Sequence, residues 1–201
     1  MEKKFKLTEE TINVYGITLY RIEAIISFGN ISAGDKGGYV QKEENVSQSG
    51  NAMVSGNAMV YGNACVSGDA EVSGNAMVYG DAEVYGDARV YGDARVYGNA
   101  RVSGDAWVSG NARVYGNARV YGDAMVSGDA IIKNKGCESP KSYLSIGPVG
   151  NNRFITLERS VGIINAGCFS GTIEEFEKAV KDKYGDESDY YRVIEFFKSI
   201  I

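Results

Sequence analysis

A six-residue motif repeats without interruption through the middle of this chain, and it constrains the fold more than any other feature. The motif reads Gly, then Asn or Asp, then Ala, any residue, Val and finally Tyr or Ser. It occurs fourteen times from Gly50 to Lys133, and the last unit has Ile132 in the Val position and Lys133 in the final position. A period of six fits neither an α-helix nor a flat sheet with one polar face. Within the motif, the side chains of Ala and Val point to one side and those of their neighbours to the other, as in a short strand. The Gly-Asn or Gly-Asp pair turns the chain, because these residues tolerate left-handed backbone angles.

Three such strands and three turns close a coil of 18 residues. Coils stacked at roughly 4.8 Å, the strand spacing of a sheet, form a triangular prism filled by valine and alanine. This pattern resembles the left-handed parallel β-helix of hexapeptide-repeat proteins. The sequence therefore predicts a mainly β chain in which residues 50–133 form about five triangular coils. A single coil cannot bury its own valines, so such a stack needs several coils and a cap at each end.

The flanking segments are predicted to supply these caps. Residues 1–49 form an N-terminal β cap and an irregular first coil, in which Val40 and Val46 keep the six-residue step before a two-residue excess. The strands of this cap are expected within residues 5–28, with a turn near Tyr15-Gly16.

Residues 134–201 form a small α+β module in this prediction, with a linker over 134–142 followed by strands. Thr172-Ile-Glu-Glu175 reads as a capping box that opens a first helix, which ends at Gly185. A second helix is expected from about Ser188 to the chain end.

The composition argues against several classes of function. The chain has no histidine, which removes the usual general base, the commonest metal ligand and any Ser/His/Asp or Cys/His arrangement. Its net charge of −5 gives no general attraction to nucleic acid or to an anionic membrane. No apolar run suggests a secretion signal or a membrane span, and three cysteines without CxxC spacing suggest reduced thiols. We therefore expect a cytoplasmic protein with no catalytic residue, no bound metal and no cofactor.

Outward positions 18 residues apart should stack into columns along the prism. One face carries Tyr61, Tyr79, Tyr97 and Tyr115 beside Met59, Met77, Arg95, Arg113 and Ile131. A second face carries Cys65, Glu83, Arg101 and Arg119, and the third carries Met53, Glu71, Arg89, Trp107 and Met125.

Two interpretations of these columns remain open. In the first, the tyrosines are surface stacking, and each arginine pairs with a corner acid such as Asp87, Asp93 or Asp105. In the second, the first face is an oligomer interface, with a trimer favoured, and arginines and aromatics line clefts between subunits that bind a nucleotide-like anion. The expected interface residues are Met59, Met77, Tyr61 and Tyr79. The expected ligand-binding residues are Arg89, Arg95, Arg101, Arg113, Arg119, Tyr97, Tyr115 and Trp107.

Cys168 precedes the first predicted helix and is a candidate nucleophile, since a helix N-terminus lowers a thiol pKa. No histidine can partner it, and the surrounding Gly-Cys-Phe-Ser-Gly also suits a tight turn with a small buried thiol. The role of Cys168 stays open.

Two stretches outside the repeat carry a resemblance to a known family. The stretch GDKGGYVQKEENVS (34–47), which runs into the repeats, resembles proteins scattered through phage and prophage genomes. The ending YLSIGPVGNN…GCFSGTIEEFEKAV (143–180) resembles the C-terminal module that many of them carry. These hexapeptide-repeat proteins are often labelled acyltransferases because of the prism. The resemblance implies a phage-encoded accessory protein made inside a bacterium, where small phage proteins often counter host defences.

Three hypotheses about function follow. The first is a non-enzymatic binding protein that sequesters a host defence protein or an anionic nucleotide-type immune signal. The second is a structural or assembly module that holds a host or phage protein through its C-terminal module. The third, an acyltransferase, is disfavoured because that chemistry uses a histidine that the chain lacks.

Overall fold

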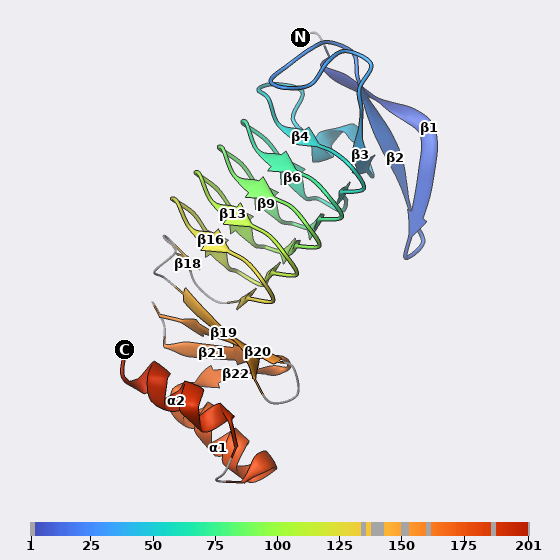
Figure 1. Cartoon of the computed structure of the whole chain (residues 1–201). Helices are drawn as coiled ribbons and strands as arrows, with labels where there is room; N and C mark the ends of the chain where they lie inside the picture. Colours follow the sequence, from blue (N-terminus) through green and yellow to red (C-terminus); the bar gives the residue numbers. More distant parts are fainter. Residues whose placement is uncertain are drawn as a thin grey trace.

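The computed structural model describes residues 3–133, 136–137, 143–149, 153–159, 162–185 and 188–200. It is a parallel β-helix: a prism of three sheets carries a β hairpin at its N-terminal end and an α+β module at the other (Figure 1). The fold class expected from the repeat is confirmed.

The three walls of the prism are built from short parallel strands, one from each coil. The tyrosine sheet contains β1 (Phe5–Val14), β2 (Ile17–Ala24), β3 (Lys36–Val40), β5 (Met59–Val60), β8 (Met77–Gly80), β11 (Arg95–Gly98), β14 (Arg113–Val114) and β17 (Ile131–Ile132), in that order. Its first three strands pair antiparallel and extend the wall beyond the coils, whereas the pairing from β3 onward is parallel. The Arg101 sheet contains β6 (Cys65–Val66), β9 (Glu83–Val84), β12 (Arg101–Val102), β15 (Arg119–Val120) and β18 (Gly136–Cys137). The Trp107 sheet contains β4 (Met53–Val54), β7 (Glu71–Val72), β10 (Arg89–Val90), β13 (Trp107–Val108) and β16 (Met125–Val126).

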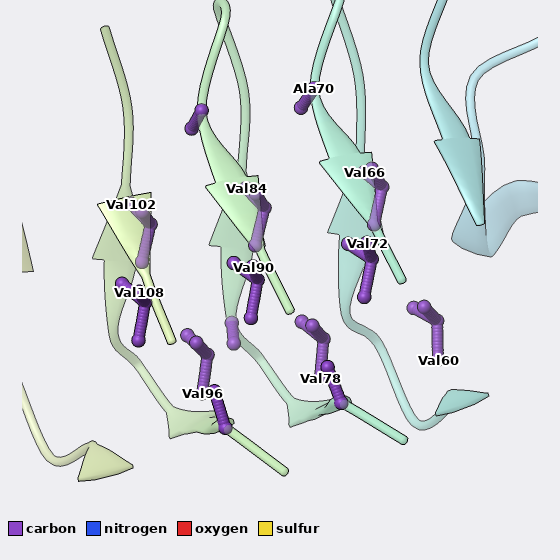
Figure 2. Close-up of a cluster of buried hydrophobic side chains, with 14 of the residues drawn as sticks. Val60, Val66, Ala70, Val72, Val78, Val84, Val90, Val96, Val102 and Val108 are labelled. Carbon is purple, nitrogen blue, oxygen red and sulfur yellow. The ribbon is translucent and has the colours of Figure 1, made fainter. Parts of the chain in front are cut away.

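The interior is filled by the valines and alanines of the repeat. Figure 2 shows valines from the three walls turned into the prism, and every repeat Val and Ala is at most 1% exposed. Strand residues pair in register with the same position of the next coil, as Val78 does with Val96. Identical apolar side chains therefore stack along the axis and form one continuous core.

The corner glycines are required by the backbone and, between stacked coils, by the neighbouring coil as well. Gly86 has φ +73°, a left-handed conformation that strains other residues. A Cβ atom there would also lie 3.0 Å from the backbone nitrogen of Gly104 in the next coil. Coils can approach at sheet spacing only because the corner has no side chain.

The N-terminal end of the prism is closed by side chains that replace a missing coil. Buried Lys4 donates from Nζ to the carbonyl oxygens of Gly50 and Ala52, at 3.1 and 2.7 Å. Asn45, in the short 3-10 helix η1 (Glu43–Asn45), donates from Nδ2 to the carbonyls of Gly62 and Ala64, at 3.2 and 2.8 Å. These groups satisfy carbonyls that a preceding coil would otherwise pair.

The first coil is irregular, as the sequence suggested. Val40 pairs with Val60, and Val46 pairs with Val66. Both pairs thus span two residues more than the pairing of Val78 with Val96.

The C-terminal end is closed in the same manner by the sheet of β19 (Tyr143–Val149), β20 (Arg153–Glu158), β21 (Ile163–Ala166) and β22 (Phe169–Thr172). The backbone N–H of Ile131 donates to Thr156 Oγ1 at 3.4 Å, and that of Lys133 donates to Glu158 Oε1 at 3.3 Å. Asn165 donates from Nδ2 to the Ile131 carbonyl at 3.2 Å. Three buried polar side chains thus serve the edge of the last tyrosine-sheet strand.

Two helices cover this C-terminal sheet, α1 (Ile173–Tyr184) and α2 (Tyr190–Lys198). The capping box is present: Glu175 N donates to Thr172 Oγ1, and Thr172 N donates to Glu175 Oε2. The predicted linker differs from expectation, because Gly136–Cys137 pair in parallel with β15 as β18. Parallel strand pairing thus continues beyond the last repeat unit, although Gly136 and Cys137 do not follow the repeat motif. The other linker positions lie outside the described residues. No helix in the described ranges has the length and apolar character needed to cross a membrane.

Candidate functional site

The predicted tyrosine column lies on the outer surface of the tyrosine sheet. The rings of Tyr61, Tyr79, Tyr97 and Tyr115 stack at centroid distances of 4.9–5.0 Å with interplanar angles of 1–2°. Parallel in-register strands place each ring over the same position of the next coil, so the sequence period alone produces the column.

The β1–β2 hairpin covers the N-terminal half of this column. Tyr61 is only 7% exposed and forms a buried cluster with Leu19 and Tyr39. The partly buried members packed against this cluster are Ile12, Val14, Ile17, Met59, Met77 and Tyr79. The four residues expected at an oligomer interface therefore belong to one apolar cluster with the chain's own hairpin, and any subunit interface at this place would have to include that hairpin.

The other half of the face is open, and it brings four of the expected ligand-binding residues together. Arg95 and Arg113 are directly opposite each other on β11 and β14, and both are exposed. Tyr97 and Tyr115 lie one outward position further along, and both are half-buried. Within the described part of the chain neither arginine pairs with an acid. Two like charges in register thus remain without compensation.

The stacking of the tyrosine rings on one another limits how they can contact a ligand. Tyr97 has a parallel ring on each side, so neither of its faces is free to stack on a base. A ligand would meet the ring edges and hydroxyl groups instead. The column therefore offers hydrogen-bond donors beside the arginines, and the expected stacking between these rings is not available.

Burial sets the protonation of the column. It raises the pKa of Tyr61 to about 12, and Tyr79 adds to this effect. Burial also raises the pKa of Tyr79 and of Tyr115. The positive charge of Arg113 opposes the rise at both tyrosines. The phenol groups of all three tyrosines are therefore protonated donors at neutral pH.

The C-terminal module borders the open half. The charges of Glu158 and Cys168 both contribute to the raised pKa of Tyr115. The site is thus bounded by the hairpin at one end and by the module at the other.

The remaining expected residues lie on the other two walls. On the Arg101 sheet, Arg101 Nε is 3.2 Å from Glu83 Oε2, while Arg119 has no acid partner among the described residues. On the Trp107 sheet, the Arg89 guanidinium lies 5.5 Å from the Trp107 ring centroid. One chain does not bring these residues to Arg95 and Arg113, so a shared site would need several copies.

Corner acids do not neutralise the repeat arginines. Asp87, Asp93 and Asp105 were the expected partners, but no ion pair joins them to an arginine within the described residues, and Arg101 pairs with a strand residue instead. The prediction of corner pairing is wrong. The acid partner of Arg101 comes from the same column, one coil away, because register places Glu83 and Arg101 side by side.

A pocket in the C-terminal module was not foreseen. It lies between β21–β22 and the two helices and has a volume of about 220 Å³. Its lining consists of Ala166, Cys168, Phe169, Phe176, Ala179, Val180, Lys183, Tyr184 and Tyr190. The Cys168 thiol is exposed there rather than buried in a turn. The capping box predicted where α1 begins but carried no signal for a gap beside the helix.

Metal-ligating clusters of three or more His, Cys, Asp or Glu are absent from the described ranges. No group of residues in those ranges therefore stands out as a holder for a metal ion.

Comparison with known proteins supports the repeat assignment. A family model described as the YdcK beta solenoid repeat matches residues 52–68, 70–86, 94–110, 106–119, 112–128 and 118–134. No curated protein matches the chain. The central part of the chain is thus similar to a family of repeats that build β-solenoids.

Proposed function

We propose that this protein is a non-enzymatic, phage-encoded accessory protein that counters host defence by sequestering a host factor in the bacterial cytoplasm. The factor is an anionic, nucleotide-type signal. The observation that carries the ligand class is the in-register pair Arg95 and Arg113, exposed and without an acid partner among the described residues. The phage context rests on the resemblance of residues 34–47 and 143–180.

The chemistry of the open half favours an anion with several oxygen acceptors. Each guanidinium offers a planar fork of donors that matches a phosphate group. The Tyr97 and Tyr115 hydroxyls add donors, and the described surface there supplies no carboxylate paired with either arginine. Phosphate recognition is therefore the main source of affinity, and Tyr97 contributes no base stacking, since a parallel ring lies on each of its faces.

Calorimetry with a panel of cyclic and ADP-ribose-type nucleotides tests the proposal. We expect binding by the intact protein and a loss of at least tenfold in Arg95→Gln and in Arg113→Gln, since charge-assisted contacts to phosphate are worth about 1.5–3 kcal/mol. Arg119→Gln is the matched control, because Arg119 is also exposed but lies on the Arg101 sheet. Flat heats with every nucleotide from a folded protein would reject the small-molecule version.

The second candidate is an assembly module that holds a protein through the C-terminal module. The apolar pocket beside Cys168 favours it, because such pockets receive the anchor side chains of partners. Deleting residues 134–201 would also remove the cap formed by Thr156, Glu158 and Asn165, so a point variant is the cleaner test. Ala179→Trp, which fills the pocket, would abolish this activity and leave nucleotide binding unchanged.

Acyl transfer is the third candidate, and nothing in the site favours it. It would require turnover of acetyl-CoA without a histidine. Turnover that persists after Cys168→Ser would revive it.

A further inference from the structure

The tip of the β1–β2 hairpin displays an aromatic side chain on a strained backbone. Tyr15 has φ +51°, and it is the one non-glycine residue with a positive φ in the described part of the chain. Asn or Gly is the favoured residue in such a turn, and a bulky residue is disfavoured there. Tyr15 gains no packing in return, because it is 90% exposed. The turn therefore carries a conformational cost, and it presents an exposed aromatic ring.

Beyond the last coil of the prism, the pocket of the C-terminal module has the complementary character. Its volume of about 220 Å³ lies below the usual range of small-molecule sites, about 300–1,000 Å³. It suits one large side chain. Aromatic residues form much of its wall, notably Phe169, Phe176 and Tyr190.

One cation in this lining adds charge complementarity to the match in size. Lys183 Nζ lies 5.3 Å from the Tyr184 ring centroid, and the described residues give Lys183 no carboxylate partner. A phenol offers this ammonium both an acceptor oxygen and a negative ring face. A tyrosine therefore fits the pocket better than an aliphatic side chain does.

We propose that Tyr15 of one copy inserts into the C-terminal pocket of a second copy, so that the protein associates head to tail. A chain cannot fill its own pocket, because the hairpin lies beside the first coils and the helices lie beyond the last (Figure 1). The contact joins two different surfaces, so each copy can use both its hairpin tip and its pocket. Such heterologous contacts generate rings or filaments rather than closed dimers. This inference is independent of the anion site, which involves neither Tyr15 nor the pocket.

Sedimentation velocity over a wide concentration range tests the contact. The intact protein should associate beyond a dimer. Tyr15→Asn should weaken association at least tenfold, yet keep or improve stability, because Asn suits the left-handed position. Tyr15→Phe, which keeps the ring, should retain most of the association. Ala179→Trp should act like Tyr15→Asn by filling the pocket.

Mixing the two defective variants separates this contact from a symmetric one. Tyr15→Asn keeps a working pocket and Ala179→Trp keeps a working tip, so an equal mixture should form dimers and nothing larger. Alkylation of Cys168 supplies a second readout, since its exposed thiol lines the pocket. Its modification rate should fall as the concentration of intact protein rises, but not for Tyr15→Asn.

Three outcomes would overturn the proposal: intact protein that stays monomeric throughout, Tyr15→Asn that associates like the intact protein, or a mixture that grows beyond dimers. Nucleotide binding should be unchanged in Tyr15→Asn, so a failure here and a failure of the proposed anion site give different results.

Discussion

The Nζ atom of Lys4 donates a hydrogen bond of 2.7 Å to the carbonyl oxygen of Ala52, at the edge of the first repeat coil. The side chain is buried, with 2% of the residue exposed, and burial lowers its pKa to about 8. A neutral amine still has two N–H groups, enough for the carbonyls of Gly50 and Ala52. The cap can therefore persist when the lysine loses its charge.

We predict that stability rises with pH above about pH 8. An unfolded lysine holds its proton to about 10.5, whereas folded Lys4 releases it near 8, so the unfolded state binds more protons between these values. The gain should be roughly 2 kcal/mol between about pH 8 and about pH 10. Tyr61 acts in the opposite direction above its ordinary pKa of 10.0, because its folded pKa is about 12. The free energy of unfolding, measured with denaturant from neutral to alkaline pH, should therefore pass through a maximum. Lys4→Met should remove the rise in this free energy above about pH 8.

We expect Asn45→Asp to destabilise the fold although the shapes of the two residues are almost identical. Asn45 is fully buried and donates to the carbonyls of Gly62 and Ala64, while its Oδ1 accepts from Lys42 N at 3.0 Å. The substitution keeps the Lys42 contact but places a carboxylate oxygen against two carbonyls. The cost should exceed about 2 kcal/mol at neutral pH. It should shrink in acid, where a protonated carboxyl can donate again; a cost that does not depend on pH would argue against this account.

The crowding between coils can be measured with two matched glycines. Gly86 and Gly128 have φ of +73° and +64°, so alanine is strained at both. A Cβ at Gly86 would lie 3.0 Å from Gly104 N, whereas none of the neighbouring atoms lies within 4 Å at Gly128. Gly128→Ala should therefore cost about 1 kcal/mol from backbone strain alone. Gly86→Ala should cost clearly more in the same denaturation assay, and equal costs would mean that the coils yield without strain.

The prism could be predicted from the sequence because its rule is local. Each Ala-x-Val places its own side chains in or out, and the 18-residue coil then stacks Tyr97 over Tyr115 without further information. The capping box at Thr172 could also be predicted from the sequence, since Thr172 and Glu175 lie within one helical turn.

The parts that could not be predicted depend on contacts between distant segments. No period in the sequence indicates that Leu19 packs on Tyr61 and so covers half of the column. Likewise, nothing near Thr156 indicates that it will accept from the last coil. The acid partner of Arg101 was missed for a different reason: the prediction considered the corner acids, whereas register pairs Arg101 with Glu83.

The pairing of Glu83 with Arg101 suggests a direct test of the open arginine pair. Glu83 lies one coil before Arg101 in the same column, and Arg95 stands in the same relation to Arg113. Arg95→Glu should therefore form an ion pair with Arg113 and relieve the repulsion between like charges. We expect a gain in stability of about 0.2–1 kcal/mol, which diminishes in high salt, as denaturation at two salt concentrations would reveal. The same substitution should abolish nucleotide binding, because it places a carboxylate where the phosphate would lie. Arg119→Glu changes the net charge equally on another wall, so equal losses of binding in both variants would show that overall charge, and not this pair, holds the ligand.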